Sequence, residues 1–438
     1  MRSTALLTDQ YELTMVQACL RSGSAGRRVV FELFARHLPA GRRYGVVAGT
    51  GRFLDALDDF RFSDEQVAWL RGSGIVDDRT AQWLAGFRFR GDVWGYPEGE
   101  VYFGGSPVLV VEATFAEAVV LETLALSVLN HDGAVASAAS RMVAAAGGRP
   151  CIEMGSRRTH EDAAVAAARA AYVGGFVSTS NLAAGLAHGI PTAGTSAHAF
   201  TLLHDTERDA FAAQIESLGP GTTLLVDTYD VAAAVRTAVE VAGTGLGKVR
   251  IDSGDLLDVA AQVREQLDSL GARDTEVVVT SDLDEHAIAA LAAAPVDGFG
   301  VGTALVTGSG HPTCGFVYKM VARAVSDAPD APMAGVAKHS PQKSTVAGRK
   351  WAQRRFGPGE VAVAEVVGTG GMPAGEDASR PLLVELVRRG ERVWREPLAE
   401  SRRRHRRSVA ELPLAAHQLS RGEPVLPTVY ETDRGPSR

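Results

Sequence analysis

The stretch KVRIDSGDLLDVAAQVREQLDSLGARDTEVVVTS, residues 248–281, contains the pattern that decides the fold. A short apolar run at Lys248–Asp252 is followed by an amphipathic segment at Leu256–Leu270 and by a second apolar run at Glu276–Thr280. Short runs rich in Val and Ile, separated by a helical period, predict a strand–helix–strand unit. Two strands joined by such a helix pair in parallel, and a parallel sheet is buried on both faces.

The same alternation continues on both sides of this unit. Seven strands that alternate with helices predict a parallel α/β fold and favour an irregular α/β barrel, with an open doubly wound sheet as the alternative. The expected strands are Pro150–Met154, Gly175–Val177, Pro191–Gly194, Thr223–Asp227, Lys248–Asp252, Glu276–Thr280 and Val296–Val301. The helices expected between them include Asp162–Tyr172, Glu207–Ser217, Val231–Val241, Leu256–Leu270 and Asp284–Ala293.

The two ends of the chain do not follow this alternation. Near the N-terminus a helix is expected over Leu7–Cys19 with Thr8 as its N-cap. Two Ala-rich helices are expected next, one ending near Asn130 and one over 134–146, and a basic cluster at 402–407 is expected on a solvated helix face. Strand patterns occur at 29–34, 93–111, 335–339, 361–367 and 382–386, and helical ones at 51–57 and 64–70.

We therefore expect an α+β sheet domain at 1–115, a barrel at 116–316, and a segment at 317–438 that completes the sheet domain and adds tail helices.

The overall composition gives no sign of a surface for nucleic acid or membranes. The chain has 45 Lys and Arg against 52 Asp and Glu, so an anionic substrate needs a local basic site. No apolar run approaches the roughly 18–20 residues that span a bilayer, and the N-terminus lacks the apolar core of a secretory signal. The cysteines, at 19, 151 and 314, indicate neither disulfides nor zinc, so we expect a cytoplasmic protein.

Polar residues gather where the predicted strands end, which is where a β/α barrel builds its active site. Arginines suit anionic oxygens, and Gly/Ser/Thr loops that open helices offer backbone N–H groups to phosphate. Aspartates suit Mg²⁺ or ribose hydroxyls, so the set predicts a site for a phosphorylated sugar and a metal ion. These residues lie at 153–158, 178–181, 195–198, 227–228, 250–255, 281–282 and 300–303.

Seven short motifs in this pattern resemble those of nicotinate phosphoribosyltransferases, members of the type II phosphoribosyltransferase group. Their order and spacing, from residue 8 to about residue 350, carry the resemblance. It implies an irregular α/β barrel with an open-faced α+β sheet domain built from both chain ends. The motifs are TDQYELTM (8–15), EMGSRR (153–158), STSNLAAG (178–185), GTSAHAF (194–200), RIDSGDL (250–256), SDLDE (281–285) and FGVGT (299–303).

The resemblance implies an activity and an assembly. The reaction would be ATP-coupled transfer of the 5-phosphoribosyl group from phosphoribosyl pyrophosphate to nicotinate, which gives nicotinate mononucleotide and pyrophosphate for NAD biosynthesis. Mg²⁺ would be required and ATP would be a co-substrate. The enzyme would be a homodimer whose active sites are shared between subunits.

The resemblance also assigns roles to single residues. Arg250 would bind the nicotinate carboxylate, and His198 would accept a phosphoryl group from ATP. Asp252 and Asp255 would hold the ribose hydroxyls and Mg²⁺. The other implied substrate contacts are Tyr11 and Met154 at the pyridine ring, Arg157, Arg158, Ser180, Asn181, Thr195, Ser196 and Asp282, and Gly300, Gly302 and Thr303 at the 5′-phosphate.

Two positions bear on substrate choice. Relatives often place Phe where Met154 stands, so we expect a thioether to pack on the ring with less rigid stacking. The loop 178–181 has no carboxylate, whereas nicotinamide-using relatives carry an acid there, and this favours nicotinate. The alternatives are a nicotinamide or quinolinate phosphoribosyltransferase and a non-catalytic sensor of phosphoribosyl pyrophosphate.

Overall fold

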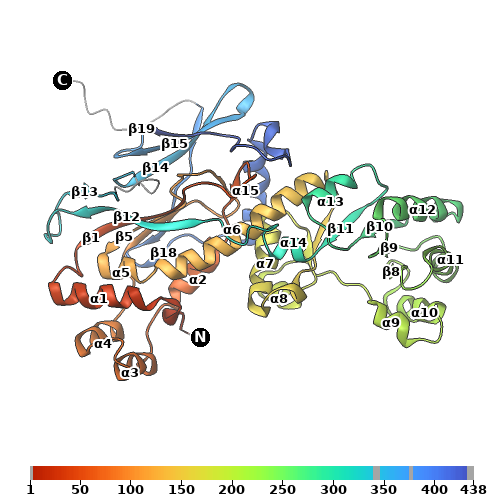
Figure 1. The fold of residues 1–438 in the computed structure, drawn as a ribbon, viewed down its shortest axis with the longest axis horizontal. Helices are drawn as coiled ribbons and strands as arrows, with labels where there is room; N and C mark the ends of the chain where they lie inside the picture. The colour runs from red at the N-terminus through yellow and green to blue at the C-terminus, as the bar shows by residue number, and fades with distance from the viewer. Residues whose placement is uncertain (1–2, 339–345, 374–377, 432–438) are drawn as a thin grey trace. The chain divides into compact units, whose positions relative to one another are not determined.

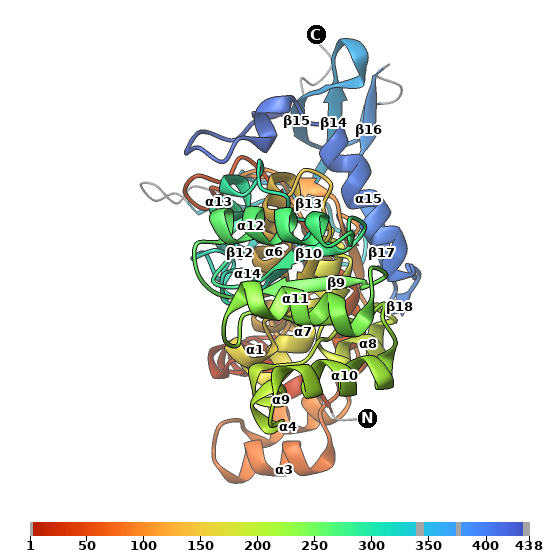
Figure 2. The ribbon, with the colours of Figure 1, turned by 90° about the vertical axis from the view of Figure 1, so that its right-hand side faces the viewer.

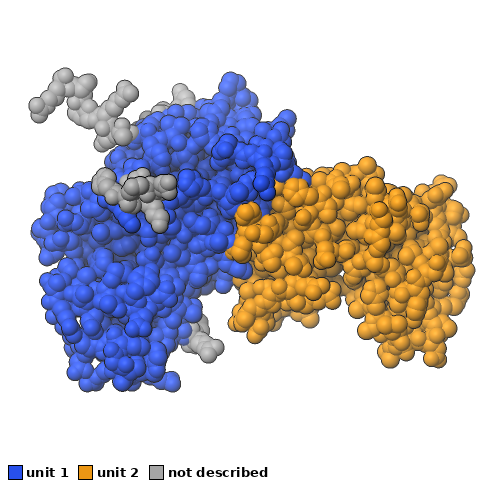
Figure 3. Space-filling view, viewed as in Figure 1, with its two compact units in different colours: residues 1–134, 313–438 blue, residues 135–312 orange. Residues whose placement is uncertain are grey.

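The computed structural model describes residues 3–338, 346–373 and 378–431, and it divides into two compact units. Unit 1 consists of residues 1–134 and 313–438, and unit 2 consists of residues 135–312 (Figure 3). Both ends of the chain therefore belong to unit 1. The units meet after residues 134 and 312, whereas divisions were expected after residues 115 and 316. A single helix, α6 (Glu122–Ala145), runs through the boundary at residue 134.

Helix α6 takes the place of the two helices expected over this stretch. Gly133 does not end it, although glycine is a poor helix former. A Cβ at Gly133 would lie 2.8 Å from Cys314 Sγ, so glycine allows the helix to pack closely there. By length and composition alone, residues 115–145 could cross a membrane, but 67% of their most apolar window is buried inside the protein, as in a core helix.

Unit 2 contains a six-stranded parallel sheet in the order β7-β6-β11-β10-β9-β8 (Figure 1). The last strand along the chain pairs with the first, which is the neighbour relation of a barrel. The strands are β6 (Cys151–Glu153), β7 (Ser178–Thr179), β8 (Thr223–Leu225), β9 (Lys248–Ile251), β10 (Glu276–Val279) and β11 (Gly298–Val301).

The barrel is open at one place, which makes it irregular, as expected. The predicted strand at 191–194 forms only one bridge, between Thr179 and Thr192, and is not paired with β8. The sheet is therefore a curled half-barrel, and the GTSAHAF segment lies in sequence between Thr192 and β8 at the opening. The open doubly wound alternative is wrong, because the first and last strands are neighbours.

Helices follow the strands of unit 2, and most begin at a side-chain cap. Asn181, Asp230, Asp255 and Asp284 accept backbone N–H groups at four of these starts. Helices α10, α11 and α12 pack side by side, and α12 covers β9 and β10 (Figure 2). The helices are α7 (Glu161–Val173), α8 (Leu182–His188), α9 (His198–Leu203), α10 (Glu207–Leu218), α11 (Val231–Ala242), α12 (Leu256–Ser269), α13 (Glu285–Ala290) and α14 (Thr303–Val306).

Unit 1 is built around a seven-stranded sheet that combines both ends of the chain, as predicted. The order is β13-β12-β1-β5-β3-β17-β18, and all its pairs are antiparallel. The strands are β1 (Arg28–Ala35), β3 (Asp92–Gly95), β5 (Leu109–Thr114), β12 (Phe316–Ala324), β13 (Met333–Gly335), β17 (Val384–Arg388) and β18 (Glu391–Arg392). Part of the strand expected at 335–339 lies outside the described residues.

Two smaller sheets and six more α-helices complete unit 1. The smaller sheets comprise β16 (Ser379–Pro381), β14 (Lys350–Phe356), β15 (Ala362–Thr369) and β19 (Thr428–Glu431), and β2 (Gly45–Val46) with β4 (Val101–Tyr102). The helices are α1 (Gln10–Ser22), α2 (Thr50–Asp58), α3 (Asp64–Gly72), α4 (Asp78–Ala85), α5 (Phe115–Val119) and α15 (Leu398–Ala410). Asp9, not Thr8, is the N-cap of α1, because Thr8 ends a preceding 3-10 turn.

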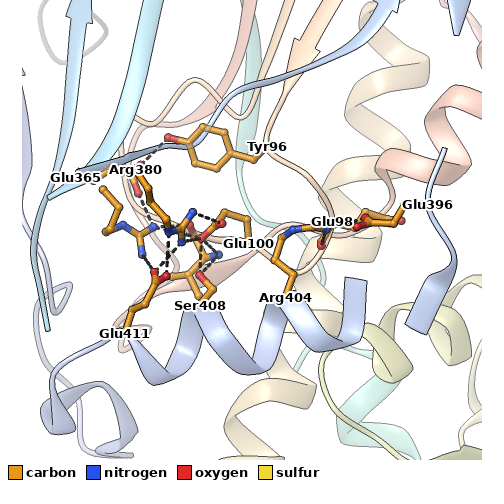
Figure 4. A network of polar contacts seen from close by, with 11 residues as sticks. Tyr96, Glu98, Glu100, Glu365, Arg380, Glu396, Arg404, Ser408 and Glu411 are labelled. Carbon is orange, nitrogen blue, oxygen red and sulfur yellow. Dashed lines mark hydrogen bonds and ion pairs between the residues drawn. The ribbon is translucent and has the colours of Figure 1, made fainter. Parts of the chain in front are cut away.

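A buried charged network ties α15 and the β14–β15 pair to the rest of unit 1 (Figure 4). Arg354 on β14 is fully buried and pairs with Glu365 at 2.9 Å. Arg380 binds both carboxylate oxygens of Glu100 at 2.8 Å and also pairs with Glu411. The cluster at 402–407 is thus not simply a solvated face, because its central His405 is buried.

Candidate active site

A pocket of about 240 Å³ opens where the strands of unit 2 end. Every residue that lines it belongs to unit 2. Three arginines and one histidine face two aspartates, so the pocket carries the basic excess that an anionic ligand needs. The lining residues are Met154, Arg157, Arg158, His198, Arg250, Asp252, Thr280, Ser281, Asp282, Gly300, Gly302 and Thr303.

Arg250, on strand β9, is held on several sides. Its Nε donates to Thr280 Oγ1 at 2.9 Å, and its Nη2 donates to Asp252 Oδ2 at 2.7 Å. Its Nη1 donates to Thr195 Oγ1 at 2.8 Å and more weakly to the Ser196 carbonyl at 3.4 Å. The side chain is 13% exposed, so the guanidinium is a fixed cation that reaches solvent only at the pocket.

Asp252 lies beside a second carboxylate, that of Asp227. Asp227 Oδ2 accepts from the Asp252 backbone N–H at 2.8 Å and from Ser253 Oγ at 2.6 Å. Its Oδ1 is buried and has no hydrogen-bond partner among the described residues. A buried carboxylate oxygen without a donor fits a hard cation such as Mg²⁺, which commonly uses one or two protein carboxylates and takes its other ligands from substrate and water.

A complete metal cage made only of protein groups is absent from the described residues. Asp255, predicted as a metal ligand with Asp252, does not line the pocket. Its carboxylate caps α12 by accepting from the backbone of Leu257 and Asp258. Neither Asp227 nor Asp255 lines the pocket, but the unpartnered Oδ1 of Asp227 makes this residue a further candidate ligand beside Asp252. The Asp252–Asp255 pair stays a prediction.

His198 begins helix α9 in the GTSAHAF segment. Its Nδ1 lies 3.1 Å from Thr228 Oγ1, in the loop that follows β8, and the ring also lines the pocket. This contact bridges the opening of the half-barrel. The imidazole is only partly buried, as an acceptor of a phosphoryl group must be.

The turn after β11 brings backbone close to the pocket. A Cβ at Gly300 would lie 2.5 Å from Thr280 Cγ2 and 2.7 Å from Met154 Sδ, so only glycine fits there. At Gly302 a Cβ would lie 3.3 Å from the Met154 carbonyl oxygen. Because these positions lack side chains, a phosphate group can approach the backbone N–H groups of this turn.

Buried Glu153 joins two loops beneath the pocket. Its carboxylate accepts from the Gly155 N–H and the Thr179 hydroxyl, and burial raises its pKa. The Ser180 N–H donates to the Glu153 carbonyl at 2.8 Å. Neutral donors therefore surround this acid, which acts as a support and not as a charge offered to ligands.

Besides Asp255, five predicted site residues do not line the pocket, which are Tyr11, Ser180, Asn181, Thr195 and Ser196. Ser180 is exposed, and Asn181 caps α8 and donates to Ser156 Oγ at 3.0 Å. Tyr11 belongs to unit 1, where it is 46% exposed and where burial, with the charges of Glu122 and Glu12, raises its pKa to about 12. Thr195 and Ser196 lie near the pocket, because both accept hydrogen bonds from Arg250, which lines it. Their substrate contacts stay predictions.

The resemblance gave no role to three residues that the structure places at or beside this site, which are Asp227, Thr280 and Ser281. Asp227 and Thr280 are the last positions of two predicted strands, and that position was the signal for them. Ser281 lines the pocket with a φ of +144°, a conformation that favours glycine and costs roughly 1–3 kcal/mol in other residues. No spacing in the sequence marks this strain.

Comparison with protein families matches both units. Residues 6–130 match the N-terminal domain model of nicotinate phosphoribosyltransferase, and residues 150–327 match the model of the nicotinate phosphoribosyltransferase family.

Individual relatives extend the match to nearly the whole chain. Nicotinate phosphoribosyltransferase pncB1 of Mycobacterium tuberculosis is 55% identical over 97% of this chain and 94% of its own. The Bacillus subtilis nicotinate phosphoribosyltransferase is 37% identical over 80% of this chain and 72% of its own. The crystal structure of human nicotinic acid phosphoribosyltransferase superposes with a TM-score of 0.82 at 26% identity and covers 97% of each chain.

Proposed function

Because this chain belongs to the nicotinate phosphoribosyltransferase family, an enzyme family of pyridine nucleotide biosynthesis, we propose how its own residues perform the transfer. The substrates are nicotinate and phosphoribosyl pyrophosphate, and the products are nicotinate mononucleotide and pyrophosphate. The pyridine nitrogen attacks C1 of the sugar, the bond from C1 to the pyrophosphate oxygen breaks, and pyrophosphate leaves. ATP drives the reaction as a co-substrate.

The observation that carries this proposal is the fixed guanidinium of Arg250 in a pocket with a basic excess. A planar guanidinium binds a planar carboxylate through two parallel hydrogen bonds, which suits nicotinate and not nicotinamide. Met154 packs beside Gly300 at the base of the pocket, where its thioether can contact the pyridine ring.

The sugar phosphate binds opposite this arginine. The turn at 300–303 holds the 5′-phosphate through backbone N–H groups, and Arg157 and Arg158 contact the anionic oxygens from the loop after β6. Asp252 and Asp282 face the ribose hydroxyls. No side chain needs to form a covalent bond to the sugar, because alignment of the nitrogen with C1 and stabilisation of charge supply the rate.

A metal ion would neutralise charge on the leaving pyrophosphate when it is bound. Asp227 and Asp252 would hold it, with substrate oxygens and water as its other ligands. Nε2 of His198 attacks the γ-phosphorus of ATP and ADP leaves, while Thr228 fixes the ring through Nδ1. Water then cleaves the phosphohistidine and releases phosphate. A phosphorylated His198 would add negative charge at the opening of the half-barrel and order the loops there.

A homodimer completes this proposal, with Tyr11 contributed to a shared active site. Four leucines on α8 and α9 are largely exposed in the single chain: Leu182 at 76%, Leu186 at 92%, Leu202 at 62% and Leu203 at 78%. Burial of these leucines against a second copy of the chain would remove their apolar surface from water, so we propose α8 and α9 for the interface. The three cysteines are free, in keeping with a reducing cytoplasm.

A side-by-side turnover assay tests the function. Purified protein is incubated with phosphoribosyl pyrophosphate, Mg²⁺, ATP and one of nicotinate, nicotinamide or quinolinate. We expect nicotinate mononucleotide and pyrophosphate with nicotinate, at a rate far above that with the other two. Preferred use of nicotinamide or quinolinate would reassign the substrate, and binding without pyrophosphate release would indicate the sensor.

A further inference from the structure

We propose that Thr280 is a positioning residue whose single hydroxyl sets both Arg250 and Asp252. The inference rests on the proposed role of Arg250 in binding nicotinate. Thr280 directly follows strand β10, lines the pocket and is only 4% exposed. Its Oγ1 accepts from Arg250 Nε at 2.9 Å and donates to Asp252 Oδ1 at 2.8 Å.

The direction of these two hydrogen bonds follows from the groups involved. A guanidinium N–H can only donate, and an ionised carboxylate can only accept. A hydroxyl has one proton, so Thr280 must give that proton to Asp252 and offer a lone pair to Arg250. No aliphatic side chain of the same size can replace either bond.

The contacts also select one edge of Arg250. Nε and Nη2 point to the same edge of a guanidinium, and here Nε contacts Thr280 while Nη2 contacts Asp252 Oδ2. Asp252 receives the second bond from Thr280 on its other oxygen, so three side chains form a closed ring. Nη1 is bonded to Thr195 Oγ1 at 2.8 Å, so the ring with Thr280 and Asp252 completes the set of contacts that fix the plane of the guanidinium. That plane sets the direction from which a planar carboxylate can reach the remaining N–H groups.

A second threonine, at the opposite end of strand β10, provides an internal comparison. Thr275 precedes β10, is 1% exposed, and donates its hydroxyl to the Leu246 carbonyl at 2.8 Å. This hydroxyl bonds to backbone and not to a side chain, and Thr275 does not line the pocket. Substitution of Thr275 therefore measures the effect of losing a buried hydroxyl alone. Substitution of Thr280 also breaks the hydrogen-bonded ring with Arg250 and Asp252.

Kinetics of matched variants test the proposal. Thr280→Val should raise the KM for nicotinate by about 10- to 100-fold, as expected for a lost hydrogen bond to a charged group, and should also lower kcat. Thr280→Ser should restore most of both. Thr275→Val should lower the thermal midpoint while leaving the KM for nicotinate within about 2-fold of wild type, because it acts only on stability. If the valine variant at 280 folds poorly, Thr280→Ala replaces it.

A double-mutant cycle shows whether Thr280 acts through Arg250. Thr280→Val should add nothing to the KM for nicotinate once Arg250→Ala is present. The proposal is overturned if Thr280→Val binds nicotinate like wild type, if serine is as impaired as valine, or if the two effects add. If Arg250→Ala alone leaves the KM for nicotinate unchanged, the role proposed for Arg250 fails first, and the inference fails with it.

Discussion

The two units use the same charged groups in opposite ways. In unit 1, Arg354 and Glu365 are fully buried and meet only other protein groups. In unit 2, Arg157 and Arg158 are exposed at the pocket, and a buried oxygen of Asp227 has no donor among the described residues. Arg354 lies against the carboxylates of Glu100, Glu365 and Glu411, although its Nε and Nη1 have no hydrogen-bond partner among the described residues. The arginines at the pocket of unit 2 instead face solvent, where a ligand can reach them. The difference separates charges that hold the fold from charges that bind substrate.

The largest expected effect comes from breaking the buried ion pair between Arg354 and Glu365 in unit 1. Arg354→Met leaves Glu365 buried without its cation and should lower the free energy of unfolding by about 3–5 kcal/mol. Denaturant unfolding measures this loss. Arg355→Met is the matched control. Arg355 is the next residue on β14 and pairs with Glu431 at 2.8 Å, with both side chains about one-third exposed, so this substitution should cost about 1 kcal/mol or less. Equal losses in the two variants would refute the closed network.

Acid should reveal a second buried group of unit 1. Burial lowers the pKa of His405 to about 4, with Arg402 and Arg406 adding to the effect. The unfolded chain, with a histidine pKa near 6.5, therefore binds more protons between pH 6.5 and 4, so stability falls as pH falls through this range, by about 3 kcal/mol.

His405→Leu should remove this part of the pH dependence, as measured by denaturant unfolding at pH 7 and pH 4. The exposed His417→Gln gives the control. A His405→Leu variant that loses as much stability on acidification as wild type would show that His405 does not stay neutral in the fold.

Substitution of an arginine in the pocket of unit 2 should weaken substrate binding more than it lowers the free energy of unfolding. Arg250→Met should weaken nicotinate binding by about 1.5–3 kcal/mol, the usual range for a hydrogen bond to a charged group, and should raise the KM for nicotinate more than that for the sugar substrate. Its free energy of unfolding should change by less than that of Arg354→Met. An equal rise in both KM values would reassign this arginine.

The smallest expected effect concerns backbone strain. Ser281 in the pocket and Ala378 in unit 1 both have positive φ, at +144° and +73°. Glycine at either position should raise stability by about 1 kcal/mol, because relief of strain exceeds the entropy that glycine adds to the unfolded chain. Only Ser281→Gly should lower kcat, since only Ser281 lines the pocket. A similar kinetic change in Ala378→Gly would argue against stored strain at the site.

The parallel sheet of unit 2 could be predicted because its strands are apolar runs between amphipathic helices. The opening of the half-barrel could not be predicted. The apolar pattern at 191–194 indicates a strand but does not indicate whether that strand pairs with β8. The break expected between residues 130 and 134 is absent from α6, where Gly133 lies close to Cys314. This contact joins residues far apart in sequence, so the local pattern does not reveal it.

Contacts between residues far apart in sequence also decide which site residues could be assigned from the sequence. Arg250 lies on strand β9 and Asp252 directly follows it, and their side chains pair at 2.7 Å. Asp255 shares the same motif but caps a helix, and a short motif does not reveal which of two aspartates faces a ligand. The fold of both units was thus predictable from pattern, whereas the choice among neighbouring polar residues required the tertiary contacts.

A crystal structure of the complex with nicotinate mononucleotide would test the central claim most directly. The account predicts that the pyridine carboxylate lies within hydrogen-bonding distance of the Arg250 Nη atoms. It also predicts that the 5′-phosphate lies against the backbone of residues 300–303. A nucleotide bound outside this pocket, or one whose carboxylate makes no contact with Arg250, would contradict it.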